Sequence, residues 1–476
     1  VRLEVGPKFP ILVRLDAKEY RIENGIVLDD FLVTAKLAES AGADALDVSA
    51  YGNTSKGIAF TEAPLVHEPG GFIPFARIAK KTVSIPIIAV GRIELQDAEK
   101  GLSAGDFDFV AMGRKLLADP DLPNKISTGD TQLVRPCIYC YICVSQIFIN
   151  QPMTCAVNAR LGKEYMNENI ICSTAQQKNI LIIGAGPSGM EAARLLGEQG
   201  HKVQIWDREK DIGGTVRVAA LAYEPNGRLI DYLKNSLDNL GISISLNTEA
   251  TLDNINAMAP DQVIIATGAK RNAPKIKGTH LPNVFDGEEM RGLLFGTDKQ
   301  AAKKLSGVSQ VMLTIGRWSQ MLRSISTLRV LSKLWMPIKD QVTIIGGDLV
   351  GLELAEFLID RGRKICVLEP SQTLGANLSI VRRSRVIHLL KEHGCELVTN
   401  ATVEQITTAG VHYKTEDIDH FHHSKQVIIA LGATSDRTLY DQVQTTDIPV
   451  VQIGDCRDVG YIHGAMADAR DAILKL

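Results

Sequence analysis

Short apolar runs of β-strand character alternate with helical stretches over the first 110 residues of the chain. The runs read ILVRL, ALDVSA, IPIIAV and FDFVAM, and apolar residues recur at helical spacing between them, as over 29–41 and 95–103. Strands that alternate with helices are typical of a parallel sheet. Four such units make up half of a (β/α)8 barrel, so the pattern predicts a half barrel over residues 1–130.

The second part of the chain contains an internal duplication. The segments NILIIGAGPSGMEAARLLGEQGHKVQIWD and QVTIIGGDLVGLELAEFLIDRGRKICVLE align without a gap. In each copy an acidic residue falls 23 positions after the first glycine, Gly184 to Asp207 and Gly346 to Glu369. The phrases VIIATG, which ends at Gly268, and VIIALG also match. The chain therefore contains two copies of one nucleotide-binding design.

The first copy places G-A-G-P-S-G after a predicted strand and at the start of a helix, which is the context that a dinucleotide site requires. Gly184 makes the tight turn, Gly186 lets the backbone approach a pyrophosphate, and Gly189 lets helix and strand pack closely. The helix N-terminus then faces the phosphates, and Asp207 would accept hydrogen bonds from the ribose hydroxyls. A glycine turn without a ligand is the alternative, which the duplication disfavours.

The second copy departs from the motif at one position. It reads Gly346-Gly347-Asp348-Leu-Val-Gly351, so an aspartate stands where the second glycine belongs. A carboxylate there would crowd and repel a pyrophosphate, and we expect weaker nucleotide binding unless Asp348 points away or the phosphates shift toward the amides near Gly347. Glu369 is followed by proline rather than arginine, which favours NAD(H) over NADP(H).

Near the end of the chain, VVQIGDCRD places Gly454 and Asp455 after a short strand. The phrase resembles the terminal Gly-Asp of two-dinucleotide flavoprotein reductases, whose aspartate holds the FAD ribityl chain; a surface turn is the alternative. This resemblance assigns residues 176–285 and 432–476 to an FAD domain, and residues 286–431 to a nested NAD(H) domain. Within the latter, 317–335 is predicted to be a basic amphipathic helix, for which packing between domains is favoured over membrane contact.

Four of the eight cysteines crowd into one segment: Cys137, Cys140 and Cys143 lie within seven residues, and Cys155 follows. Disulfide frameworks belong to small secreted domains, so a metal or cluster site is predicted over residues 131–175. Zinc usually takes two separated C-x-x-C pairs, whereas three close cysteines and a remote fourth favour a 4Fe–4S cluster. Zinc remains the alternative.

Two glycine–arginine pairs end the last strands of the half barrel. Gly91-Arg92 follows PIIAV, and Gly113-Arg114 follows DFVAM. Barrel ligands bind at the carboxyl ends of strands, and glycine amides beside an arginine can grip a phosphate. Arg14, within VRLDA, would point into the barrel mouth, where a cation stabilises the anionic pyrimidine edge of a reduced flavin. A surface ion pair is the alternative for each arginine.

Together these phrases resemble the Old Yellow Enzyme-related flavoproteins with an iron–sulfur cluster, the family of 2,4-dienoyl-CoA reductase, 2-enoate reductase and trimethylamine dehydrogenase. The resemblance is carried by VRLDA, VGRI, FVAMGRKLLADPD, RPCIYCYIC, TCAVNARLG and GAGPSGMEAA, and it covers essentially the whole chain. It implies an α/β fold with the C-terminal half of the barrel, a cluster segment and two nested Rossmann-like domains. It also implies FMN at the half barrel, FAD in the first dinucleotide domain, and a 4Fe–4S cluster at the four cysteines.

The family's first four barrel strands are absent from the sequence, and with them the histidine pair and the tyrosine that hold the substrate and protonate its carbon. His67 is the one weak replacement, and a solvated loop histidine is the favoured interpretation of it. An open sheet with two unpaired edge strands would aggregate, so we expect a partner chain or an upstream segment to complete the barrel.

The leading hypothesis is an NADH-dependent oxidoreductase that passes electrons through FAD, the cluster and FMN to an enoate, enone or enoyl thioester. An amine dehydrogenase of the same family, and an electron-transfer subunit completed by a partner, are the alternatives. A formal charge of -3 does not indicate binding to nucleic acid, so small-molecule partners are expected. An oligomer is also expected. Neither a spanning run nor a leader is recognised, which predicts a cytoplasmic location. Substrate and direction of electron flow stay open.

Overall fold

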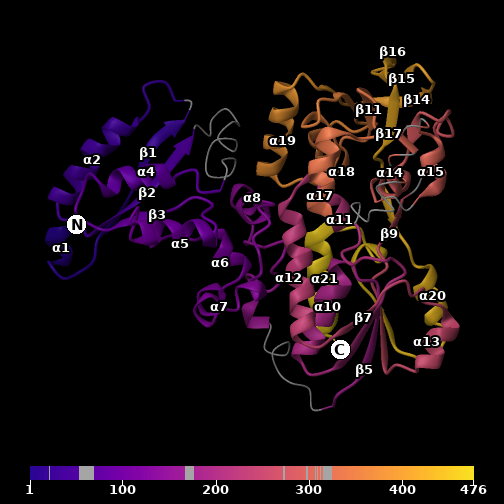
Figure 1. Ribbon diagram of the computed structural model, residues 1–476, viewed down its shortest axis with the longest axis horizontal. Coiled ribbons are helices and arrows are strands. Elements are labelled where there is room, and N and C mark those ends of the chain that lie inside the picture. The colour runs from indigo at the N-terminus through magenta and orange to yellow at the C-terminus, as the bar shows by residue number, and fades with distance from the viewer. Residues whose placement is uncertain are drawn as a thin grey trace. The chain divides into compact units, whose positions relative to one another are not determined.

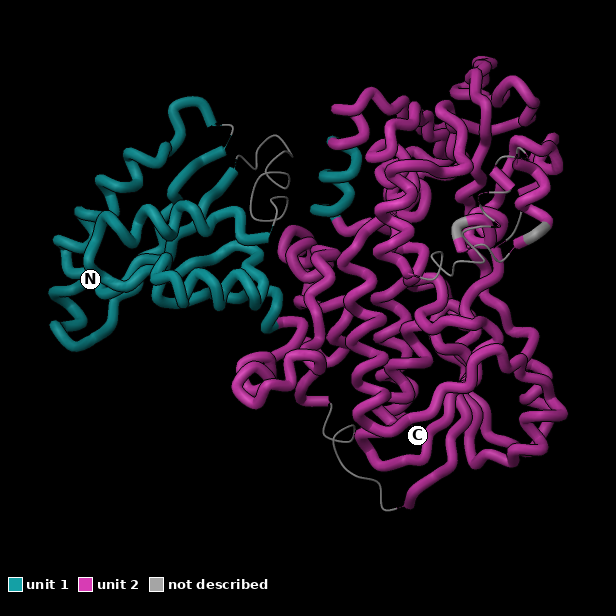
Figure 2. The backbone as a smooth tube through the Cα atoms, viewed as in Figure 1, with its two compact units in different colours: residues 1–116, 380–388 teal, residues 117–379, 389–476 magenta. Residues whose placement is uncertain are grey.

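The structure is a computed structural model of the 476-residue chain. The residues that it describes are 1–20, 22–52, 69–166, 176–271, 274–295, 298–305, 307, 309–310, 312, 314 and 324–475. The chain divides into two compact units (Figure 2). The first consists of residues 1–116 and 380–388, and the second of residues 117–379 and 389–476.

The first unit is built on a four-stranded parallel sheet of order β1-β2-β3-β4. Helices alternate with these strands (Figure 1), as the sequence pattern predicts. Apolar strand residues and one face of the helices over 28–40, 73–80 and 95–104 form its core, for example Leu46 and Ile87 from the sheet and Phe31 from a helix. The elements are α1 (Arg2–Val5), β1 (Leu12–Tyr20), α2 (Leu28–Ser40), β2 (Ala45–Gly52), α4 (Ile73–Lys80), β3 (Ile87–Ala89), α5 (Leu95–Ala104), β4 (Phe109–Val110) and α6 (Arg114–Ala118).

The second unit begins with the cysteine segment and a five-stranded parallel sheet of order β19-β8-β5-β6-β7. Ile180 and Ile182 of β5 pack on one face of this sheet, while Leu181 and Ile183 pack on the other, as expected for a strand buried on both sides. The elements are α7 (Leu122–Thr128), α8 (Ile142–Phe148), β5 (Asn179–Ile183), α10 (Pro187–Glu198), β6 (Lys202–Trp206), α11 (Val216–Ala222), α12 (Pro225–Asn239), β7 (Ser243–Ser245), α13 (Leu252–Met258), β8 (Gln262–Ile265), α20 (Thr438–Val443), β19 (Val450–Gln452) and α21 (Tyr461–Ile473). Single 3-10 turns lie at Thr131–Leu133, Glu164–Met166 and Gly454–Cys456.

A second five-stranded parallel sheet has the order β10-β17-β11-β12-β13, and an antiparallel sheet of order β14-β15-β16 accompanies it. Strands β9 and β18 pair with each other where the chain passes between the two parallel sheets. The elements are β9 (Ala269–Arg271), β10 (Val284–Phe285), α14 (Gly287–Leu294), α15 (Lys299–Lys303), α17 (Ile325–Leu334), β11 (Gln341–Ile345), α18 (Leu349–Ile359), β12 (Lys364–Leu368), α19 (Ile380–Glu392), β13 (Glu396–Val398), β14 (Thr402–Ile406), β15 (Gly410–Thr415), β16 (Ile418–His423), β17 (Gln426–Ile429) and β18 (Ala433–Ser435).

Two details refine the predicted organisation. Strand β10 pairs with β17, so the residues just before the expected boundary at 285 belong to the second sheet. The helix expected over 317–335 is seen as α17 only from Ile325 onward, because residues 315–323 lie outside the described part of the chain. Arg329 of α17 donates to the carbonyl oxygens of Ala220 and Leu221 on α11 at 3.1 and 3.0 Å, which fits a helix packed between domains.

A helix that crosses a bilayer needs about 20 predominantly apolar residues. None of the described helices is both long enough and apolar enough to cross a membrane.

Candidate functional site

The glycines of the first nucleotide loop differ in what surrounds them. Gly184 has a φ of 114°, and an ideal Cβ on it would lie 2.3 Å from the carbonyl oxygen of Ala266. An ideal Cβ on Gly189 would lie 2.0 Å from the carbonyl oxygen of Gly184. At Gly186 no heavy atom lies within 4 Å of that position. The outer glycines are therefore required by chain packing, whereas Gly186 faces open space at the start of α10, as a pyrophosphate site needs.

The acidic residue of the first copy is fixed by backbone amides. Asp207 accepts from Ala185 N through Oδ2 at 2.6 Å and from Glu209 N through Oδ1 at 2.8 Å. The second copy repeats these contacts: Glu369 accepts from Gly347 N at 2.6 Å and from Ser371 N at 2.8 Å. The sequence separations are also equal, 22 and 2 residues in both copies. The two copies therefore match in individual hydrogen bonds as well as in amino-acid sequence.

The terminal Gly-Asp phrase lies against the same loop. An ideal Cβ on Gly454 would lie 2.4 Å from Ser188 Oγ, in the first turn of α10. Asp455 is half-buried and accepts from Gly460 N at 3.0 Å; its burial raises the pKa of its carboxyl group. Gly268, with a φ of 79°, follows β8, the neighbour of β19 in the sheet. The residues predicted to bind FAD thus gather at one end of the first parallel sheet.

A cavity of about 460 Å³ opens beside this loop. Its wall includes Gly214, whose ideal Cβ position lies 3.3 Å from the Cα of Gly186. The wall also includes Arg217, which pairs with Asp211 at 2.8 Å and lies 4.4 Å from the ring centroid of Phe295. The wall carries both signs of charge, because it also includes Glu209, Glu288 and Asp298. A cavity of this kind beside an open glycine leaves room for a ligand.

In the second copy the outer glycines repeat the tight packing. The φ of Gly346 is 107°, and an ideal Cβ on Gly351 would lie 1.8 Å from the carbonyl oxygen of Gly346. The substituted position differs, because Asp348 carries a side chain there. Its carboxylate accepts from Asn377 twice, from N at 2.9 Å and from Nδ2 at 2.5 Å. Asn377 thereby fixes the carboxylate toward the loop that follows β12.

We expect Asp348→Asn to tighten NADH binding by about fivefold. The change removes a negative charge near the predicted phosphate position while keeping the size of the side chain, and two charges a few ångströms apart in a solvated site interact by about 1 kcal/mol. Titration of the intact protein with NADH measures the dissociation constant. Asn377→Ala is the matched comparison: it frees the carboxylate and should weaken binding. Equal affinity in all three proteins would mean that this charge does not act on the nucleotide.

In the first unit, the two glycine–arginine loops follow the neighbouring strands β3 and β4. Gly91 has a φ of 106°, and Arg92 follows with a φ of 49°. Gly113 leads into α6, which starts at Arg114. The two loops are joined by an ion pair of 2.5 Å between Lys115 and Glu94, which sequence analysis did not single out. The four predicted phosphate-binding residues therefore lie on adjacent, tied loops.

Arg14 lies on β1, at the opposite edge of the sheet from β4. Its Nε and Nη2 atoms donate to Asp47 Oδ2 at 2.8 and 2.5 Å, and Asp47 is its register partner on β2. The Arg14 side chain is 60% exposed, so the pair has the character of the surface ion pair weighed as its alternative. His67, the weak catalytic candidate, lies outside the described residues.

The cysteine segment has an unusual backbone. Tyr139 and Tyr141, on either side of Cys140, have φ values of 50° and 61°, a conformation that costs free energy for bulky residues. Both tyrosines are buried. Tyr223 Oη donates to the Tyr139 carbonyl oxygen at 3.2 Å, and Ser379 Oγ donates to the Cys140 carbonyl oxygen at 2.6 Å. Packing and hydrogen bonds therefore hold a strained loop, as is common where a ligand is bound.

The four predicted ligand cysteines interact with one another. Burial raises the pKa of Cys140, and the neighbouring thiols of Cys155, Cys137 and Cys143 raise it further. Within the described chain, no three of their sulfur atoms lie within 4.8 Å of one another. A tetrahedral zinc ion with bonds of 2.3 Å needs sulfur atoms about 3.8 Å apart. At least one sulfur–sulfur distance in every trio is therefore longer than a zinc ion with bonds of this length requires.

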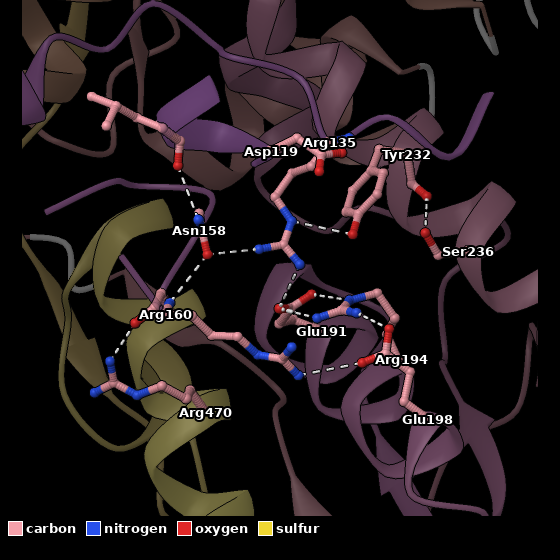
Figure 3. A network of polar contacts seen from close by, with 12 residues as sticks. Asp119, Arg135, Asn158, Arg160, Glu191, Arg194, Glu198, Tyr232, Ser236 and Arg470 are labelled. Carbon is pink, nitrogen blue, oxygen red and sulfur yellow. Dashed lines mark hydrogen bonds and ion pairs between the residues drawn. The ribbon is translucent and has the colours of Figure 1, made fainter. Parts of the chain in front are cut away.

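A buried polar network lies beside this segment (Figure 3). Arg135, two residues before Cys137, donates from Nε to Tyr232 Oη at 3.1 Å and from Nη1 to Asn158 Oδ1 at 3.1 Å. Its Nη2 atom lies 3.6 Å from Glu191 Oε1 on α10. The network therefore connects the cysteine segment directly to the helix that begins at the first nucleotide loop.

The rest of the network runs along α10. Arg194 contacts Glu191 at 2.7 Å and Glu198 at 2.5 Å, and Arg160 lies 3.4 Å from Glu198. Three guanidinium groups thus face two carboxylates, which leaves one surplus positive charge. Burial raises the pKa of the Cys155 thiol, and the nearby Arg135 guanidinium opposes that rise.

Sequence analysis missed this network, although two features of the sequence could have revealed it. Arg135 is a charge next to the cysteine motif, within the phrase RPCIYCYIC. Glu191 and Arg194 are spaced for pairing on a helix whose other residues are small or apolar. The sequence does not reveal that Arg135 contacts the Glu191–Arg194 pair.

Comparison with known proteins places the chain in a family. Two family models match the chain: "Pyridine nucleotide-disulphide oxidoreductase" over residues 178–453, and "NADH:flavin oxidoreductase / NADH oxidase family" over residues 1–132. The chain belongs to the Old Yellow Enzyme-related NADH:flavin oxidoreductase family. The predicted family and enzyme class are thereby confirmed, as are its flavin and pyridine-nucleotide domains.

Individual relatives agree with the family. An NADH oxidase of Thermoanaerobacter brockii is 30% identical over 481 residues, which is 98% of this chain and 66% of the relative. A cinnamate reductase of Clostridium sporogenes is 27% identical over 492 residues, or 98% of this chain and 66% of the relative. The structure of a 2-naphthoyl-CoA reductase with 2-naphthoyl-CoA has a TM-score of 0.85 and 30% identity, covering all of this chain and 66% of that one. This member of the family thus spans about two thirds of the length of these relatives.

Proposed function

We propose that this chain passes electrons from NADH to FAD, through a 4Fe–4S cluster, to FMN, and from there to the activated C=C bond of an enoate, enone or enoyl thioester. The substrate class is supported by the two relatives whose names contain a cinnamate or an aryl-CoA ester. When bound, the flavins and the cluster supply hydride and one-electron transfer. The chain's own residues bind, orient and electrostatically tune these groups.

One observation carries the proposal: a buried polar network joins the cysteine segment to α10, the helix that follows the first nucleotide loop. Arg135, beside the cysteines, contacts Glu191 of the helix that starts at Gly186. A loop that holds a one-electron carrier and a helix that holds FAD are thus packed against each other in one compact unit. Short separation between carriers is what electron transfer from FAD to a cluster requires.

Binding residues are proposed for each group. The FAD pyrophosphate would lie on the amides around Gly186, its ribose at Asp207 and its ribityl chain at Asp455, supported by Gly184, Gly189, Gly268 and Gly454. NAD(H) would bind at Gly346, Gly351 and Glu369. The FMN phosphate would be gripped by Gly91, Arg92, Gly113 and Arg114, and Arg14, held by Asp47, would lie toward the flavin's pyrimidine edge. Cys137, Cys140, Cys143 and Cys155 would ligate the cluster.

The residues that hold and protonate the substrate are proposed to come from outside these 476 residues, from another segment or a partner chain. The family's histidine pair and tyrosine have no counterpart in this sequence. These relatives are about one and a half times as long as the region that this chain matches. Their additional length supports the proposal that the substrate-binding residues lie outside this sequence. Substrate, partner and oligomeric state belong to the same proposal.

Metal and cofactor analysis tests the proposal. Purified intact protein should contain four iron and four sulfide ions per chain, absorb broadly near 400 nm, and bleach with dithionite. FAD should be released on denaturation, and the bound flavin should be reduced by NADH before any substrate is added. Zinc at the cysteines, with iron and sulfide absent after anaerobic purification, would overturn the electron path.

A further inference from the structure

Three metal-binding side chains converge at a place that the electron path does not use. Cys366 lies in β12, Glu396 begins β13 as its register partner, and His422 lies on β16 of the antiparallel sheet. The thiol sulfur, a carboxylate oxygen and an imidazole nitrogen all lie within 4.8 Å of one another. His422 Nδ1 lies 3.2 Å from Glu396 Oε2. We propose that these three residues bind a single zinc-class divalent cation.

The donor set selects the class of ion. Thiolate, imidazole and carboxylate are the three side-chain ligands that zinc takes in proteins, whereas calcium and magnesium require oxygen donors. Bonds of about 2.0–2.3 Å in a tetrahedron place the donor atoms about 3.3–3.8 Å apart. The His422–Glu396 distance already lies at the edge of this range, and the sulfur needs a shift of about 1.5 Å at most.

Accessibility and a fourth ligand also fit. The Cys366 sulfur is buried, while the side chains of His422 and Glu396 are 26% and 52% exposed, so an ion can arrive from solvent. A water molecule takes the fourth position, as in zinc sites with three protein ligands.

Bound metal would link two sheets. Cys366 and Glu396 belong to the second parallel sheet, whereas His422 belongs to the antiparallel sheet. An ion held by all three would pin these sheets together and stiffen β12, whose last residue precedes Glu369, the proposed ribose-binding acid. The site is therefore structural for the nucleotide domain and separate from the four-cysteine segment.

Zinc binding by the intact, iron-loaded protein tests the assignment. The protein is equilibrated with micromolar zinc, desalted and analysed for metal, and its melting temperature is recorded with and without zinc. Wild type should retain one zinc per chain and melt at a higher temperature with it. His422→Gln should lose that zinc, or bind it at least about tenfold more weakly, with its iron content unchanged.

A neighbouring histidine provides the control. His423→Gln alters the next residue of β16, which is exposed and whose side chain points to the other face of the strand, and it should retain the zinc. His422 is partly exposed, so its replacement should leave the fold intact, and the unchanged iron content checks this. Zinc retained by His422→Gln, or a wild type that binds none, would overturn the assignment.

Discussion

Glu191→Gln is expected to destabilise the second unit by about 3–5 kcal/mol. The Glu191 side chain is 3% exposed and lies between two guanidinium groups, at 2.7 Å from Arg194 and 3.6 Å from Arg135. Glutamine keeps the shape but removes the charge that both cations face, so Arg135 loses its carboxylate partner and Arg194 keeps only the more exposed Glu198. Urea unfolding followed by tryptophan fluorescence measures the loss, because Trp206 lies on β6 of the adjoining sheet.

Glu198→Gln is the matched control on the same helix. Glu198 also pairs with Arg194, at 2.5 Å, but its side chain is 40% exposed. Water can replace an interaction there, and the expected loss is below about 1 kcal/mol. Equal losses in the two variants would show that burial of the Glu191 charge is not what matters.

The stability of the folded protein should depend on pH because of the Glu191 carboxylate. Burial alone would raise the pKa of Glu191, but the charges of Arg194 and Arg135 more than offset this and hold the pKa below its usual value of 4.5. A carboxyl group with a lowered folded-state pKa contributes stability that is complete above the unfolded-state value and is lost as pH falls through the folded-state value. Wild type should therefore lose stability below about pH 4.5 more steeply than Glu191→Gln. Parallel curves would contradict this account.

The nucleotide loops could be predicted from the sequence because their requirements are local. Gly184 and Gly346 need a positive φ, and Gly189 and Gly351 leave no room for a Cβ, so each motif reports its own geometry. The fixed offset to the acidic residue follows from one strand–helix–strand unit, and it reappears as matching amide contacts. The alternation of short apolar runs with helices likewise predicts parallel sheets.

Partners distant in the chain could not be predicted in this way. Arg135 meets Tyr232 across 97 residues, and Ser379 meets the Cys140 carbonyl across 239. Which side chain faces a charge depends on how whole helices and strands pack, and the local sequence does not reveal that packing. Asp348 illustrates the same limit: the sequence reveals a carboxylate at the glycine position, but only the fold reveals that Asn377 holds it.

Arg135→Gln is expected to lower the midpoint potential of the proposed cluster by about 50–100 mV. Arg135 is a buried cation close enough to the Cys155 thiol to favour its anionic form. Reduction adds an electron to the same region, so a nearby positive charge favours the reduced state, and its removal lowers the potential. A shift of this size corresponds to about 1–2 kcal/mol, which is the order of the interaction between unit charges in neighbouring groups at an effective dielectric constant near 20. A redox titration of the intact protein, followed by optical and paramagnetic resonance spectra, measures it.

Two further variants separate charge from packing at this position. Arg135→Lys keeps the positive charge and should recover most of the potential, even though lysine cannot reproduce the contacts to Tyr232 and Asn158. Arg160→Gln removes a charge from the far end of the same network, where the side chain is 27% exposed, and should shift the potential much less. If Arg135→Lys falls as far as Arg135→Gln, the geometry of the guanidinium, and not the surplus positive charge, sets the potential. A wild type without iron would instead refute the cluster itself, so failure of the tuning argument and failure of the electron path are distinguishable.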